Sequence, residues 1–133
     1  MNRTAFERLV ENTLATLPTE YAGRLHNLVF LIEDWADPAT LAEVGIVDPA
    51  ELLGFYNGTP LTERSHDQID PGPDRITLYH GAIELQARLS GLPIRQVIRE
   101  TLWHEIAHYF GFSEEEMDLI EVFWADRSFP ESR

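Results

Sequence analysis

Apolar residues near the start of the chain recur three and four positions apart, the spacing that places side chains on one face of a helix. Thr4 and Glu7 have the spacing of a capping box, in which two side chains satisfy free N–H groups at the start of a helix. We therefore predict a helix that begins near Thr4 and ends before Pro18, because proline lacks the N–H that a helix interior requires. Its apolar positions are Phe6, Leu9, Val10, Leu14 and Leu17.

Short apolar runs bounded by polar, glycine or proline residues predict strands further along the chain. Residues 25–32 and 75–80 are two such runs. Asn57 and Gly58 separate two apolar segments within residues 52–61, a pattern typical of a hairpin with a two-residue turn. Two prolines and a glycine interrupt residues 34–49, which predicts a loop with one helical turn.

Helices are expected again in the C-terminal part of the chain. One runs from Gly81 to near Gly91, and a longer one runs from Pro93 to Phe110, where the following glycine can end it. Residues 114–125 predict a last helix with acidic residues in its first turn. The order of the expected elements, a helix followed by strands and then by helices, indicates an α+β fold. A length of 133 residues predicts one domain over residues 1–133.

The net charge of the chain limits the classes of molecule that it is expected to bind. Ten Lys and Arg residues against 23 Asp and Glu residues give a formal net charge of −13, which disfavours nucleic acids and anionic membrane surfaces. The absence of cysteine excludes disulfides and thiolate metal sites. The longest apolar run, residues 28–32, is too short to span a bilayer, and the first residues lack the apolar stretch of a secretory signal. We therefore expect a cytoplasmic protein.

The most informative segment is His104-Glu105-Ile106-Ala107-His108, which lies on the long predicted helix. Histidines at positions i and i+4 share one helix face, so both imidazoles can reach one cation, and zinc accepts nitrogen and oxygen ligands. Glu105 points elsewhere and can act on a water molecule as a general base. On the predicted helix the two histidines lie opposite the apolar stripe of its last turns.

A catalytic zinc site usually has three protein ligands, so a third is needed. Glu114 would lie about 15 Å along a continuous helix from His104, too far to share its metal. A left-handed conformation at Gly111 would let the chain fold back, and Glu114 is the ligand that the spacing favours. The neighbouring acids remain alternatives: Glu115, Glu116 and Asp118.

This segment resembles the small bacterial zincin-like metallopeptidases, the minimal zincins, whose motif is His-Glu-x-x-His-x-x-Gly-x-x-Asp. The chain matches it at His104, Glu105, His108 and Gly111, with Glu114 in place of the aspartate. The resemblance extends through residues 53–64 and 75–81. It implies an α+β zincin-like core, with a small mixed or antiparallel sheet packed over the zinc-binding helix.

The expected function is therefore that of a zinc metallopeptidase that cleaves a peptide or protein substrate. One Zn²⁺ per chain is held by His104, His108 and Glu114, and Glu105 is the general base. One rival is a zinc-stabilised binding or regulatory module with little turnover. A metal-dependent nuclease is a weaker rival because the chain is acidic.

Other residues in the sequence could assist catalysis, but a structural role is the better expectation for each. His80 could polarise a carbonyl, and Tyr56 or Tyr79 could donate to an oxyanion, although strand tyrosines usually pack with a satisfied hydroxyl. Met117 is expected in the core. His26 and His66 have still weaker claims to a catalytic role.

Overall fold

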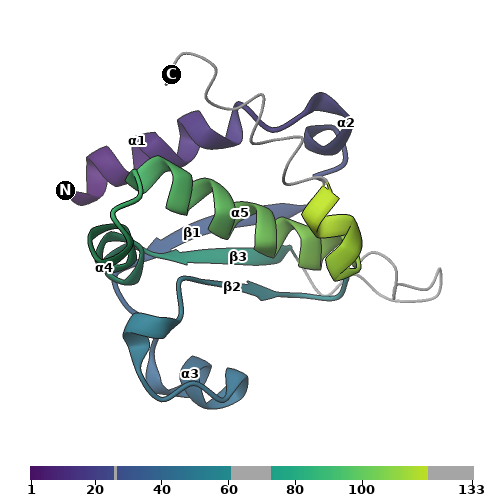
Figure 1. Cartoon of the computed structure of the whole chain (residues 1–133). Coiled ribbons are helices and arrows are strands. Elements are labelled where there is room, and N and C mark those ends of the chain that lie inside the picture. The colour runs from purple at the N-terminus through teal and green to yellow at the C-terminus, as the bar shows by residue number, and fades with distance from the viewer. Residues whose placement is uncertain (26, 61–72, 120–133) are drawn as a thin grey trace.

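Helices and a small mixed sheet make up the computed structural model, which describes residues 1–25, 27–60 and 73–119 (Figure 1). In chain order the elements are α1 (Arg3–Leu14), α2 (Thr19–Ala22), β1 (Leu28–Glu33), α3 (Pro38–Val44), the 3₁₀ turn η1 (Pro49–Glu51), β2 (Gly54–Asn57), β3 (Asp74–Tyr79), α4 (His80–Ser90) and α5 (Ile94–Phe110). Residues 114–119 are also helical. The expected α+β class is confirmed.

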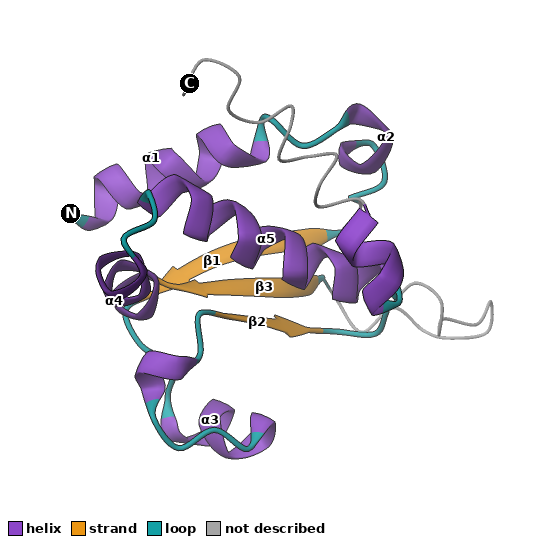
Figure 2. Cartoon of the chain, in the orientation of Figure 1, coloured by secondary structure: helices purple, strands orange, loops and turns teal. Residues whose placement is uncertain are grey.

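The sheet has three strands in the order β1-β3-β2. β1 is parallel to the central strand β3, with Phe30 opposite Ile76, and β2 is antiparallel to it, with Tyr56 opposite Ile76. Figure 2 shows α5 running along the sheet, and α5 contacts β2, β3 and α1. β2 is therefore the edge strand beside the helix that carries the His-Glu-x-x-His motif.

The core lies between α5, β3 and α1. Its largest fully buried side chains include Trp103 and Ile106 of α5, Ile76 of β3 and Phe6 of α1. Burial of large apolar side chains is the dominant stabilising term in folding. The predicted apolar face of the first helix is confirmed, since Phe6 and Val10 are buried in this core.

The start of α1 differs from the expectation. The helix begins at Arg3, and the side chain of Asn2 accepts a hydrogen bond from the Ala5 N–H at 2.8 Å. Thr4 therefore lies inside the helix and does not cap it. Asparagine is among the best N-cap residues, and it takes this role two positions before the predicted one.

The expected tight hairpin at Asn57 and Gly58 is wrong. Neither residue has the positive φ that a type I′ turn requires, and β2 pairs with β3, which follows it across residues 58–73. A Cβ on Gly58 would lie 2.3 Å from the Cγ of Asp74, so this glycine makes room for a buried carboxylate. Leu61, the end of the predicted hairpin, lies outside the described residues.

Local structure also departs from the prediction elsewhere. Residues 34–49, expected as a loop with one turn, contain the seven-residue helix α3, capped by the Asp37 side chain and ended by Gly45 in a left-handed conformation. The short helix α2 was not anticipated. No helix of the described residues is long and apolar enough to cross a membrane.

Candidate metal and catalytic site

The two faces of α5 differ sharply in exposure over its last turns. Leu102 and Ile106 are fully buried and Trp103 is 1% exposed, whereas His104 and His108 are exposed. The apolar side chains drive this face of the helix against the sheet, so the i, i+4 histidine pair is left on the opposite side. The predicted opposition of histidines and apolar stripe is confirmed.

The histidine side chains converge on one point. Their Nε2 atoms are 3.1 Å apart, and the rings meet edge to face with centroids 4.6 Å apart. Two nitrogens that each lie about 2.0–2.1 Å from a tetrahedral zinc are about 3.3 Å apart. The pair therefore fits two adjacent positions of one metal ion, in both donor type and spacing.

Glu105 lies between the helix and the edge strand. It is 8% exposed, and its carboxylate accepts a hydrogen bond from the backbone N–H of Tyr56 in β2. Burial raises the pKa of Glu105 to about 7, and the Tyr56 N–H opposes this shift. A carboxylate that is buried beside two exposed imidazoles has the surroundings of a proton-transfer group.

A glycine in β2 makes the close approach of α5 possible. A Cβ on Gly54 would lie 2.8 Å from the Cγ2 of Thr101 and 3.2 Å from the Cγ of Glu105. Only a residue without a side chain allows this separation of strand and helix. The contact is not visible in the sequence, because Gly54 and Glu105 are far apart in the chain.

The chain turns back after α5 as expected. Gly111 has φ +79° and donates to the carbonyl of Ala107 at 2.9 Å, and the Phe112 N–H reaches the same carbonyl at 3.0 Å. These bonds form a left-handed helix end of the Schellman type. Phe112 then stacks on Phe110 with ring centroids 5.1 Å apart, so the returning segment packs beside the end of the helix.

Two further contacts hold the segment that carries the acidic residues. Ser113 and Glu116 form a capping box, with the Ser113 N–H donating to Glu116 Oε1 at 3.0 Å and the Glu116 N–H to Ser113 Oγ at 3.2 Å. Trp103 Nε1 donates to the Met117 carbonyl at 3.1 Å, and Met117 is buried, as expected. The Ser-x-x-Glu spacing could have been identified in the sequence.

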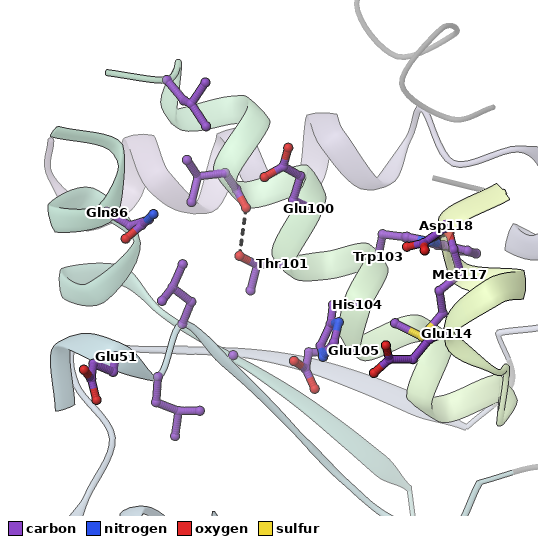
Figure 3. A pocket seen from close by; sticks show the side chains of 15 residues that line it. Glu51, Gln86, Glu100, Thr101, Trp103, His104, Glu105, Glu114, Met117 and Asp118 are labelled. Carbon is purple, nitrogen blue, oxygen red and sulfur yellow. Dashed lines mark hydrogen bonds between the residues drawn. The ribbon is translucent and has the colours of Figure 1, made fainter. Parts of the chain in front are cut away.

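The capping box distinguishes between the acidic residues that are candidates for the third metal ligand. Glu116 is engaged with Ser113, and these hydrogen bonds lower the pKa of its carboxyl. Burial and the neighbouring His104 lower the pKa of His108, and the Glu114 carboxylate opposes them. Figure 3 shows the Glu114 side chain directed toward His104 and Glu105. Glu114 is therefore the acidic residue of this segment that faces the motif.

Three ligands are not yet gathered at one point. Within residues 1–25, 27–60 and 73–119 no group of three His, Asp or Glu side chains is close enough to hold a metal ion. Glu114 thus remains a predicted ligand. Its side chain is exposed, so other staggered rotamers are open to it, and coordination would require a rotation of that side chain.

A cavity of about 570 Å³ adjoins the motif. His104, Glu105 and Glu114 line one part of it, and Leu53 and Gly54 of the β2 region line its wall. Cavities of about 300–1,000 Å³ are the usual size of ligand sites. The motif therefore lies where a substrate can reach it.

Tyr56, Tyr79 and His80 have contacts and burial typical of structural residues. The Tyr56 hydroxyl donates to Asp74 Oδ2 at 2.6 Å, and Tyr79 is 3% exposed, with its pKa raised to about 12 mainly by burial. His80 is 8% exposed, packs on Phe6 with ring centroids 4.5 Å apart and does not line the cavity. His26 and His66 lie outside the described residues.

A comparison with protein families covers most of the chain. A family model described as zincin-like metallopeptidase matches residues 25–124, from just before β1 to beyond α5. The chain belongs to the zincin-like metallopeptidase family. A search of curated proteins finds no match. Membership confirms the predicted resemblance and the zincin-like fold, and it indicates a metal-dependent peptidase of the zinc-binding class.

Proposed function

We propose that this zincin-like protein is a zinc-dependent peptidase in which His104, His108 and Glu114 hold one Zn²⁺ and Glu105 is the general base. The observation that carries the proposal is the pair of exposed Nε2 atoms, 3.1 Å apart, next to a buried carboxylate at the wall of a cavity. Family membership supports the same class of activity.

When bound, a zinc ion would act as a Lewis acid toward the scissile carbonyl and the attacking water. The histidines would hold the ion from one face of α5, and the return at Gly111 brings Glu114 to the same region. Glu105 accepts a proton from the water and delivers it to the amine that leaves when the peptide bond breaks. The Tyr56 N–H bond holds this carboxylate in place on β2.

The test replaces Glu105 by glutamine, which keeps the shape and removes the base. Glu105→Gln should bind zinc and fold as the wild type does, whereas cleavage of a broad peptide library should fall by about 10²–10⁴-fold. Glu11→Gln, which makes the same charge change on the exposed side of α1, is the control and should cleave at the wild-type rate. Rates are compared at equal zinc content.

Two outcomes contradict the proposal in different ways. Equal turnover by the wild type and Glu105→Gln would remove Glu105 from the mechanism. Absence of cleavage by the zinc-loaded wild type throughout the library would instead favour the rival function, a zinc-stabilised binding or regulatory module.

A further inference from the structure

Tyr56 of β2 contacts the proposed base and two other elements at once. Its N–H donates to the Glu105 carboxylate of α5, and its hydroxyl donates to Asp74 Oδ2 of β3 at 2.6 Å. Its ring meets that of Tyr109, four residues after Glu105 on α5, edge to face with centroids 6.2 Å apart. One residue of the edge strand therefore joins the base to the central strand of the sheet (Figure 2).

The backbone of Tyr56 is directed away from the strand beside it. In an antiparallel pair, residues whose N–H and C=O groups face the partner alternate with residues whose groups face outward. The Leu53 carbonyl accepts from the Tyr79 N–H at 2.9 Å, so Leu53 faces β3, and by alternation Tyr56 faces the free edge of the sheet. The N–H that meets Glu105 thus takes no part in the pairing of β2 with β3. Its position depends on how residue 56 itself is held.

Asp74 is the acceptor that holds the side chain of this residue. Asp74 is 4% exposed, it begins the central strand, and its N–H donates to the Asn27 carbonyl at 2.9 Å. A buried carboxylate requires hydrogen-bond donors, and bonds to an ionised group are stronger than those between neutral groups. Gly58 leaves room for the carboxylate, because a Cβ there would overlap it. The Tyr56 hydroxyl is therefore tied to a group that the sheet keeps in place.

We propose that the Tyr56–Asp74 hydrogen bond positions the Glu105 carboxylate. The bond holds residue 56 of β2, and the N–H of that residue then fixes the carboxylate beside the histidine pair. Tyr56 and Asp74 are positioning residues, since both act through Glu105 and neither takes part in breaking the peptide bond. This inference rests on the proposed function, because it concerns the base of the same reaction.

The first measurement needs no turnover. Amide hydrogen exchange at residue 56 is followed by NMR in the zinc-free chain at one pH, and each rate is corrected for the intrinsic rate of the residue present. Tyr56→Phe removes only the hydroxyl. Exchange at residue 56 should become about tenfold faster in this variant, the size expected when a hydrogen bond to a charged group is lost. Asp74→Asn keeps an acceptor oxygen and should give a smaller increase.

Tyr79→Phe is the matched control. It removes the hydroxyl of another strand tyrosine, which bonds to the Thr40 side chain on the opposite face of the sheet from Asp74. Both variants should unfold at a lower denaturant concentration, but only Tyr56→Phe should exchange faster at residue 56. Equal acceleration in Tyr79→Phe would show a general loss of stability and would overturn the inference. Unchanged exchange in Tyr56→Phe would overturn it as well.

The second measurement follows cleavage of the best substrate in the peptide library, at equal zinc content. Tyr56→Phe should lower kcat about 10–100-fold, with KM and zinc affinity unchanged, because a misplaced reacting group slows the chemical step. In the Glu105→Gln background the same substitution should have no further effect, since it acts only through that carboxylate. A wild-type kcat in Tyr56→Phe, or an equal loss in both backgrounds, would overturn the inference.

The two measurements separate this inference from the proposed function. If the zinc-loaded wild type cleaves nothing, the proposed peptidase activity fails, and the exchange rates alone decide whether Tyr56 and Asp74 position Glu105. Faster exchange at residue 56 in Tyr56→Phe, but not in Tyr79→Phe, then supports the inference.

Discussion

At the scale of single residues, three neighbours in the chain have different surroundings. His104 and His108 face solvent, and Glu105, one position after His104, is 8% exposed between α5 and β2. A rotation of about 100° per residue separates them, so the helix alone places the two imidazoles on one exposed face and the carboxylate in the protein interior. The buried position restrains Glu105, and the exposed positions leave the imidazoles accessible.

Removal of either imidazole should abolish tight metal binding. His104→Ala and His108→Ala each remove one of the Nε2 atoms that converge at 3.1 Å. We expect zinc affinity to fall by at least about 10–100-fold, since even loss of groups that support metal ligands has an effect of that size. Competition with a chromophoric chelator measures the affinity. Stoichiometric, tight zinc in both variants would contradict the assignment of the site.

Three adjacent glutamates allow a sharp test of the third ligand. Glu114→Ala should weaken zinc binding, because this carboxylate is the one directed toward the motif. Glu115→Ala is the neutral control on the same exposed turn. Glu116→Ala should bind zinc normally but unfold at a lower denaturant concentration, because it breaks the capping box with Ser113. Weakened zinc binding in Glu115→Ala or Glu116→Ala alone would give the ligand role to that residue.

At the scale of elements, the left-handed turn at the end of α5 directs the segment that carries Glu114 back toward the motif. Gly111 has φ +79°, a conformation that costs an L-residue with a side chain about 1–2 kcal/mol. Without this turn the helix direction would carry Glu114 away from His104. On the other side of the motif, Gly54 of the edge strand β2 allows α5 to approach closely. The Tyr56 N–H of the same strand donates a hydrogen bond to the Glu105 carboxylate.

A comparison of two glycines tests the role of this helix end. Gly111→Ala and Gly45→Ala place a side chain at helix ends with φ +79° and +75°, and a Cβ on Gly45 would meet no atom within 4 Å. Each variant should lose about 1–2 kcal/mol of unfolding free energy, measured by denaturant titration. Only Gly111→Ala should also weaken zinc binding. An equal zinc affinity in both variants would show that the turn does not position a ligand.

At the scale of the whole molecule, the proposed metal joins α5 to the segment that follows it. A ligand that binds only the folded chain stabilises it by mass action, by about 2.7 kcal/mol when its free concentration is 100 times its Kd. Zinc should therefore raise the unfolding temperature by several degrees, and a chelator should reverse the change. The His104→Ala variant is the control, and its unfolding temperature should not respond. A chelator-insensitive wild type would contradict a zinc site that links these segments.

Sequence alone determined the features that depend on short stretches of chain. The limits of α5 near Pro93 and Gly111 and the shared face of His104 and His108 follow from residues within a few turns of one another. Helical periodicity and the freedom of glycine at positive φ operate locally, so their pattern is visible without the fold.

Only the tertiary structure decided the rest. The pairing of β2 with β3, the burial of Glu105 against Gly54 and Tyr56, and the cavity that runs from the motif to Glu51 all join segments far apart in the chain. The Asn57-Gly58 pair misled the prediction because a local turn preference yielded to the packing of Asp74 against Gly58. Such contacts form only when distant segments meet, because burial of their side chains together outweighs what each prefers locally.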